Sequence, residues 1–355
     1  MIIPRFYLFI LASVAFIGIW FLSYKPFLYQ QLSVSQSTDG GRSLPLNHSL
    51  PPLEAAGNET LGFQKILILS TGPSWRTRGL LAAAHLTGLQ ITIPPQPPID
   101  EAIVDAFGQL GGDDDDEEHP PHGATIAWLA HLDLIKHAIQ LDLETVLIIE
   151  DDVDWDVSIR HQMVRIASAI RNLTHTEQRD QSSHPTPYGH DWDLLWIGHC
   201  GEFWNEDFET VSFEDRSACP KAQYSGWARN YLSHLPDHHR SIYWSFNPVC
   251  SFAYALSRKG MRNVLRVAGG GRGEAFDVKV MQACKAKALR CISVVPEVVH
   301  QYFPAASYGV NSLVDIGNGE AVGPDETEFE SVMGSTDNIL ESARCNALWG
   351  KTCLR

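Results

Sequence analysis

The chain has 355 residues, of which 44% are hydrophobic and 19% are charged, so it is long enough for one or two globular domains with a sizeable core. Its formal net charge of −15 argues against a broad nucleic-acid-binding surface, and we expect no nucleic-acid partner. Part of this charge is a run of six acidic residues at 113–118, which we interpret as a solvated insertion.

The first clear feature is an uncharged apolar segment, FYLFILASVAFIGIWFLS, at 6–23. About 20 apolar residues span a bilayer, so the segment is just long enough to do so. The residues that follow it do not resemble a signal-peptide cleavage site. We therefore predict a short cytoplasmic tail at 1–5 and an uncleaved transmembrane signal anchor at 6–23, which makes the membrane a partner.

A polar segment follows the anchor. Residues 24–61 are rich in Ser, Pro, Gly and Asn, which is typical of a flexible stem. N-glycosylation patterns begin at Asn47 and Asn58 in this stem, and a third begins at Asn172. These patterns predict a single-pass type II protein of the Golgi or endoplasmic reticulum membrane, with its main domain in the lumen.

The chain has seven cysteines, and none of their spacings suggests a structural zinc site. An oxidising lumen permits disulfides, with at least one thiol left over if all bridges are intramolecular. Cys345 and Cys353 are the candidate local pair, and the alternative is that both are reduced and buried.

Strands and helices alternate along the rest of the chain. Short apolar runs bounded by Gly or Pro predict strands, and longer amphipathic stretches predict helices. This alternation predicts one three-layer α/β domain over 62–335, with a C-terminal tail at 336–355. The predicted strands are 65–70, 90–93, 145–149, 194–198, 251–256 and 291–295, and the predicted helices are 79–87, 123–140, 157–172, 257–267 and 275–289. We expect 201–245 to be irregular.

The strongest chemical signal follows the predicted strand 145–149, whose continuous apolar run is typical of a parallel sheet. It continues as Glu150, Asp151, Asp152, Val153 and Asp154. Ligands of open α/β sheets bind at the carboxyl ends of the strands. Clustered carboxylates repel one another and suit a hard cation such as Mn²⁺ or Mg²⁺, which can hold a diphosphate. The alternative is a solvated loop in which Asp154 or Asp156 caps the next helix.

Three segments together resemble one known family. They are Gly-Ala-Thr-Ile-Ala-Trp-Leu-Ala-His-Leu at 123–132, Val-Leu-Ile-Ile-Glu-Asp-Asp-Val at 146–153 and Phe-Ala-Tyr-Ala-Leu-Ser-Arg-Lys-Gly at 252–260. Their order is similar to that in glycosyltransferase family 25, which includes bacterial lipooligosaccharide and animal collagen galactosyltransferases. The chain departs from that pattern at Ala124, where the family usually has Glu, and at Ala130, where it usually has Ser.

The resemblance implies a GT-A type, Rossmann-like fold with a mainly parallel central sheet. It also implies a UDP-sugar donor, commonly UDP-galactose, Mn²⁺ or Mg²⁺ as cofactor, and a glycan or glycoprotein acceptor. Carried over to this chain, it makes Asp152 a metal ligand, with Asp154 as a second candidate. Asp151 would face the ribose or the donor sugar, and Glu150 would brace the loop.

Further candidate residues lie before and after the triplet. His300 follows the last predicted strand and could be a metal ligand or a hydrogen-bonded histidine. An inverting transfer needs a general base, for which Asp277 is the first candidate and Glu274 the second; alternatively, Asp277 is a helix first-turn carboxylate. Arg76 and Arg78 follow the first strand and could bind phosphate, or be plain surface charge.

Two alternative functions remain open. The altered residues Ala124 and Ala130 are compatible with a catalytically inactive, membrane-tethered glycan-binding or scaffold homologue. Asp152 and Asp154 would also suit a metal-dependent phosphatase, although Trp155 follows where a small residue is expected. We interpret His131, on the apolar helix before the triplet, as a core histidine that orients the acidic strand.

Overall fold

The structure is a computed structural model that describes residues 53–110, 119–176, 186–305 and 331–355. The predicted cytoplasmic tail and signal anchor lie outside these ranges, and so does most of the predicted stem. Within the described ranges, no helix has both the length and the apolar character needed to cross a bilayer.

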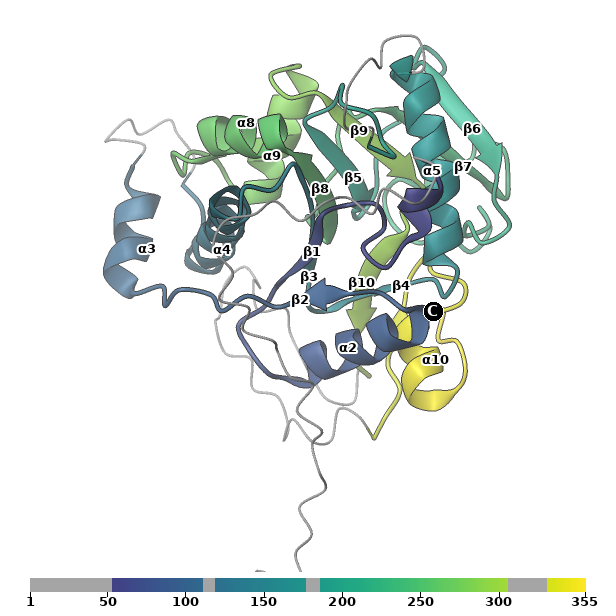
Figure 1. Ribbon diagram of the computed structural model, residues 1–355, viewed down its shortest axis with the longest axis horizontal. Coiled ribbons are helices and arrows are strands. Elements are labelled where there is room, and N and C mark those ends of the chain that lie inside the picture. The colour runs from purple at the N-terminus through teal and green to yellow at the C-terminus, as the bar shows by residue number, and fades with distance from the viewer. Residues whose placement is uncertain (1–52, 111–118, 177–185, 306–330) are drawn as a thin grey trace, which may run out of the picture. The chain divides into compact units, whose positions relative to one another are not determined.

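The core of the fold is a mixed β-sheet with the strand order β2-β1-β3-β8-β5-β9-β7-β6 (Figure 1). Strands β2, β1, β3, β5, β9 and β6 run in one direction, and β8 and β7 run in the other. The predicted mainly parallel sheet is therefore confirmed, and it is compatible with a Rossmann-like fold. The strands are β1 (Lys65–Leu69), β2 (Ile91–Thr92), β3 (Thr145–Glu150), β4 (Val153–Trp155), β5 (Leu194–Gly198), β6 (Thr210–Glu214), β7 (His239–Trp244), β8 (Ala253–Ser257), β9 (Cys291–Val295), β10 (Val299–Phe303) and β11 (Ser335–Thr336).

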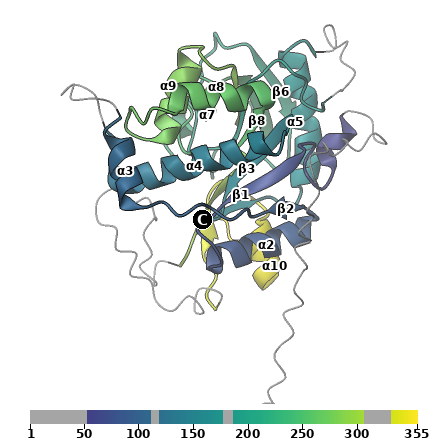
Figure 2. The ribbon, with the colours of Figure 1, turned by 60° about the vertical axis from the view of Figure 1, so that its left-hand side comes forward.

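Helices cover both faces of this sheet (Figures 1 and 2). One hydrophobic core lies between the sheet and η1, α2 and α5, and the other lies between the sheet and α3, α4, α8 and α9. The helices are η1 (Glu54–Gly57), α2 (Trp75–Thr87), α3 (Glu101–Gly108), α4 (His122–Gln140), α5 (Ile159–Leu173), α7 (Arg229–Leu232), α8 (Arg258–Ala268), α9 (Phe276–Lys285) and α10 (Ala343–Trp349).

The two cores follow from the alternation of side chains along each strand. In β1, Ile66 and Ile68 belong to the core under α2 and α5, and Leu67 belongs to the core under α4. In β3, Leu147 and Ile148 divide in the same way. A strand that is buried on both faces has apolar residues at nearly every position. The continuous apolar runs of β1 and β3 therefore predicted these strands correctly. The predicted three-layer arrangement is confirmed.

The segment 201–245, which we expected to be irregular, contains β6, α7 and β7. The sequence of β7 is His-Arg-Ser-Ile-Tyr-Trp, and its charged Arg240 suggests an exposed segment. In the structure Arg240 is buried, with only 1% of its surface exposed. The Nε atom of Arg240 donates to Asp215 Oδ2 over 2.7 Å, so the buried charge has a partner. Buried charges are usually paired, but a hydropathy pattern does not reveal the pair.

The C-terminal segment, residues 331–355, is folded. It contains β11, which pairs with β10, and α10, which packs against α2. Residues 336–355, which we predicted to be a tail after the main domain, therefore contribute to the same compact unit.

Three disulfides cross-link the fold. Cys345 and Cys353 form the predicted local bridge, so the alternative of two reduced cysteines is wrong. The other bridges join Cys200 to Cys250 and Cys284 to Cys291. The remaining cysteine, Cys219, is free and buried, in agreement with the expected leftover thiol.

Candidate functional site

The acidic triplet lies at the carboxyl end of β3, as the apolar run before it in the sequence predicted. Glu150 ends β3, Asp151 and Asp152 form a turn, and β4 follows. Leu69 at the end of β1 pairs with Glu150, so the loop after β1 reaches the same edge of the sheet. That loop ends at Ser74, whose side chain caps the N-terminus of α2.

Asp151 and Asp152, hereafter the acidic pair, are nearly inaccessible, with 5% and 7% of their surface exposed. Ser70 Oγ donates to Asp151 Oδ2 over 2.6 Å. Nη1 of Arg76 donates to Asp152 Oδ2 over 3.1 Å and lies 3.7 Å from Asp151 Oδ1. Nε2 of Gln301 also donates to Asp152 Oδ2, over 3.2 Å. The structure thus brings the predicted residue Arg76 to both carboxylates, and it adds Ser70 and Gln301.

Burial dominates the electrostatics of the acidic pair. It raises the pKa of Asp152 from 3.8 to about 6, although the charge of Arg76 lowers this pKa and the neighbouring carboxylates raise it. Burial likewise raises the pKa of Asp151. The cationic and hydrogen-bonding groups around the acidic pair therefore offset only part of the cost of burying the two carboxylates. Their hard oxygen atoms suit Mn²⁺ or Mg²⁺, so the donor set fits the predicted cation.

Glu150 is tied to the neighbouring strand and helix. Ser251 Oγ donates to Glu150 Oε1 over 2.8 Å, and Nε2 of His131 lies 3.6 Å from the same oxygen. Burial acts to raise the pKa of Glu150, but the contacts with His131 and Ser251 lower it overall. His131 is 2% exposed, shares a hydrogen bond of 3.0 Å with the Tyr254 hydroxyl and stacks on Phe276. The interpretation of His131 as a core histidine is confirmed.

Asp154 has a different role from the one expected. It is fully buried on β4, and its Oδ1 accepts the backbone amides of Trp155 at 2.8 Å and Arg344 at 2.9 Å. Its Oδ2 accepts the hydroxyl of Ser342. Asp154 therefore anchors the C-terminal segment, and we remove it from the candidate metal ligands because both of its oxygens are already engaged.

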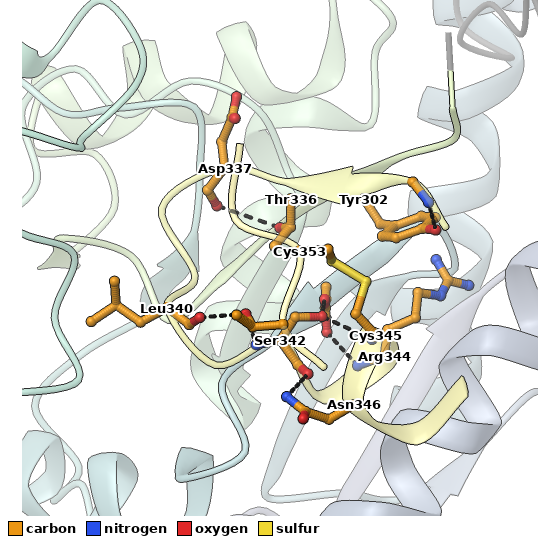
Figure 3. Close-up of a disulfide and its surroundings, with 12 residues drawn as sticks. Tyr302, Thr336, Asp337, Leu340, Ser342, Arg344, Cys345, Asn346 and Cys353 are labelled. Atoms are coloured by element: carbon orange, nitrogen blue, oxygen red, sulfur yellow. Dashed lines mark hydrogen bonds between the residues drawn. A yellow bond between two sulfur atoms is a disulfide. The ribbon is translucent and has the colours of Figure 1, made fainter. Parts of the chain in front are cut away.

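Cys345 and Cys353 lie close enough to Asp154 for their three ligand atoms to fall within 4.8 Å of one another. Both sulfur atoms are consumed by the disulfide, however, as Figure 3 shows. This second group of residues therefore offers no thiolate to a metal.

His300 lies on β10, next to Gln301, which contacts the acidic pair. Its ring packs against Phe252 and Phe303, with centroids 5.2 and 6.3 Å apart. Its Nε2 atom lies 3.7 Å from Oε1 of the buried Glu297. On β10, Gln301 rather than His300 makes a hydrogen bond with the Asp152 side chain among the described residues. Its position next to the candidate histidine was the one sequence signal for it.

The candidate bases lie at the start of α9. The backbone amide of Cys250 donates to Asp277 Oδ2 over 2.7 Å, and Ser251, the next residue, contacts Glu150. Asp277 is thereby linked to the edge that carries the acidic pair. Glu274 precedes the helix and is exposed. Arg78 is partly buried on α2, two residues beyond Arg76.

Sequence reasoning missed Arg344, a buried cation beside the site. Its guanidinium lies beside the ring of Tyr302 (Figure 3), with the guanidinium carbon 4.7 Å from the ring centroid. The same carbon lies 5.5 Å from the ring centroid of Trp75. Its Nη2 atom donates to the backbone carbonyls of Trp75 and Arg76. The guanidinium acts electrostatically on the acidic pair and on Asp154. No pattern around residue 344 announces this position.

A pocket of about 480 Å³ lies at the opposite edge of the sheet, near the start of β9. Its lining includes Trp244, Phe246, Lys285 and Arg290, and none of the predicted site residues. We therefore place the candidate site at the acidic pair rather than in this pocket.

No protein-family model matches the chain, and no curated protein matches it significantly. The resemblance to glycosyltransferase family 25 therefore stays a prediction from the ordered motifs.

Proposed function

We propose that the protein is a metal-dependent, inverting glycosyltransferase that transfers a hexose from a UDP-sugar to a glycan or glycoprotein acceptor. Galactose is the first candidate for this hexose. The observation that carries this proposal is the acidic pair, buried at the carboxyl edge of a Rossmann-like sheet and short of positive charge. The ordered motifs that resemble family 25 point to the same chemistry. The finer fold assignment, a GT-A type domain, belongs to this proposal.

The residues available to a cation support the proposal. Asp152 would hold Mn²⁺ or Mg²⁺ through its carboxylate oxygens. Asp151, which the resemblance assigned to the ribose or the donor sugar, contacts the same Arg76 nitrogen and is here a second candidate ligand. His300 on β10 remains a further candidate. Such a cation, when bound, neutralises the nucleoside diphosphate that leaves in the transfer.

The chain's own groups have separate roles in this proposal. The N-terminus of α2, 13 residues long, offers a favourable dipole to an anion, although Ser74 already accepts the backbone amide of Arg76. Arg76 on its first turn adds a guanidinium. Glu150 braces the turn through Ser251. Asp277, held by the Cys250 amide, removes the proton of the acceptor hydroxyl, with Glu274 as the second candidate base.

The proposed location follows from the sequence features outside the described residues. The signal anchor would hold the protein in the Golgi or endoplasmic reticulum membrane as a single-pass type II protein, with the catalytic domain in the lumen. The three disulfides support an oxidising compartment.

The test is a binding titration with the full-length chain in a mild detergent. Wild-type protein, Asp152→Ala and Asp105→Ala are titrated with a panel of UDP-sugars, with and without Mn²⁺. Asp105 is an exposed carboxylate on α3 and controls for the loss of one negative charge. We expect Mn²⁺-dependent binding of one UDP-sugar that Asp152→Ala loses and Asp105→Ala keeps.

A second candidate function rests on the ion pair in the site. Arg76 already pairs with Asp152 and offsets part of its charge without any metal, as a protein that has lost its metal site would need. This favours a catalytically inactive glycan-binding or scaffold homologue as the alternative. If wild-type protein unfolds cooperatively on heating but binds no UDP-sugar in the presence of Mn²⁺, the transferase proposal is wrong. The inactive homologue then becomes the preferred function.

A further inference from the structure

We propose that Arg76 takes the place of the divalent cation in the free protein, and that its transfer from the acidic pair to the donor diphosphate makes metal and donor bind cooperatively. This inference rests on the proposed function. It assigns Arg76 two successive partners, the acidic pair in the free protein and the donor diphosphate in the complex. The proposed function alone requires only the second.

The position of the guanidinium supports the first partner. Nη1 of Arg76 is 3.1 Å from Asp152 Oδ2 and 3.7 Å from Asp151 Oδ1, so one nitrogen serves both carboxylates. The side chains of Arg76, Asp152 and Asp151 are only 11%, 10% and 8% exposed. At such low exposure the carboxylates need a cationic neighbour, because an uncompensated buried charge is strongly unfavourable. A cation coordinated by both carboxylates would compete with this nitrogen for the same oxygen atoms.

The two arginines near the acidic pair differ in their freedom to move. Arg344 is 1% exposed, lies between the rings of Trp75 and Tyr302 and donates to two backbone carbonyls. Within the described part of the chain, the side chain of Arg76 donates one hydrogen bond, to Asp152, and its guanidinium carbon lies 5.4 Å from the centroid of the Trp75 ring. Only Arg76 can therefore leave the carboxylates without disturbing the packing between α2 and the C-terminal segment.

The position of Arg76 in α2 supports the donor diphosphate as its second partner. It lies on the first turn of α2, and a helix N-terminus favours phosphate groups. A guanidinium released from Asp152 loses its counter-ion, and a diphosphate provides oxygen atoms that it can bind in a bidentate manner. The cation thus frees the side chain that the diphosphate needs. Because linkage is reciprocal, the diphosphate must favour the cation by the same factor.

The experiment measures this factor by calorimetry on the full-length chain in detergent, well above the pKa of about 6 for Asp152. Dissociation constants are determined for Mn²⁺ alone, for UDP alone and for each in the presence of the other, with wild-type protein, Arg76→Gln and Lys136→Gln. Lys136 is an exposed cation on α4, paired with Asp133, and controls for the loss of one positive charge. Thermal unfolding checks that each variant is folded.

We expect wild-type protein to show a coupling factor of about tenfold or more, within the usual range for coupled sites. Arg76→Gln should bind Mn²⁺ alone several-fold more tightly than wild type and UDP more weakly in the presence of Mn²⁺. Its coupling factor should therefore fall several-fold below that of wild type, and the coupling that remains is due to direct contact between the cation and the diphosphate. Lys136→Gln should behave as wild type. Arg76→Lys keeps the charge but not the planar fork, so it should retain the weak binding of Mn²⁺ alone while losing much of the coupling.

The inference is overturned if Arg76→Gln binds Mn²⁺ no more tightly than wild type and keeps the wild-type coupling factor, since Arg76 then neither blocks the cation nor links it to UDP. Should Arg76→Gln fail to fold, an unchanged coupling factor in Arg76→Lys overturns it equally. These outcomes differ from failure of the proposed function, in which wild-type protein itself binds neither Mn²⁺ nor UDP.

Discussion

Asp152 illustrates how a candidate functional residue can oppose the stability of its own fold. Burial removes its carboxylate from water, and Arg76 and Gln301 compensate only part of that loss. A buried carboxyl with a raised pKa favours the folded state most when it is protonated. The free protein therefore keeps a strained charge at the position where the proposed cation would relieve it.

This strain gives a pH-dependent prediction. The pKa of Asp152 rises from 3.8 to about 6 on folding, so its contribution to stability falls as pH rises through this window, by at most about 3 kcal/mol. Asp152→Asn should raise the melting temperature of metal-free protein near neutral pH and have little effect near pH 4. Thermal unfolding as a function of pH, with exposed Asp105→Asn as control, measures the difference; a destabilised Asp152→Asn at neutral pH would contradict the sign.

At the scale of elements, the contact between α2 and α10 determines one wall of the site. Gly79 on α2 faces Arg344, which precedes Cys345 in α10, and a Cβ atom at residue 79 would lie 2.1 Å from Nε of Arg344. The guanidinium can reach the carbonyls of the first turn of α2 only because this side chain is absent. The same turn carries Arg76, so packing of the C-terminal segment and geometry of the acidic pair depend on each other.

Gly79→Ala should therefore reverse the usual effect of this substitution. In an open helix interior it stabilises by about 0.5–1 kcal/mol, but here we expect destabilisation of about 1–3 kcal/mol because Arg344 has no room to shift. Gly108→Ala at the end of α3 is the matched control, since a Cβ atom there meets nothing within 4 Å. Chemical denaturation measures both; a Gly79→Ala variant as stable as Gly108→Ala would show that Arg344 is not packed as described.

At the scale of the whole molecule, cysteine pairing connects the fold with its compartment. The bridges Cys200–Cys250, Cys284–Cys291 and Cys345–Cys353 join segments that are 50, 7 and 8 residues apart. The first fixes the loop before β8, the second joins α9 to β9, and the third closes the C-terminal segment. Six of the seven cysteines are therefore cross-linked, as expected for a protein that matures in an oxidising environment.

Thiol titration tests this arrangement. Burial raises the pKa of the Cys219 thiol to about 12, and the residue is 4% exposed, so the native protein should react with none of its cysteines at mildly alkaline pH. Unfolding without a reductant should reveal one thiol, and unfolding with a reductant should reveal all seven. More than one thiol in the unfolded, unreduced protein would refute the three-bridge arrangement.

The sequence by itself determined the elements whose burial shows in local periodicity. Strands β1, β3, β5 and β9 are apolar at nearly every position because both of their faces are covered, and α4 and α8 have clear helical patterns. The order of these elements also placed Asp151 and Asp152 at a sheet edge, because the carboxyl end of a buried strand is defined by the chain alone. The start of α2 was less clear: the helix begins at Trp75, four residues before the predicted start, through a capping box of Ser74 and Thr77.

Only the tertiary structure decided which polar groups meet. Asp154 and Ser342 are 188 residues apart, Asp152 and Gln301 are 149 apart, and no local pattern relates them. For the same reason β7 was not recognised, because the partner of its buried Arg240 is Asp215, which lies 25 residues earlier at the start of the segment that connects β6 to β7. Periodicity reports that a position is buried, whereas the partner that makes a buried charge tolerable is chosen by the packing of distant segments. The acidic pair could therefore be predicted, but its counter-ions Arg76 and Arg344, and the role of Asp154 as an anchor, could be assigned only from the folded chain.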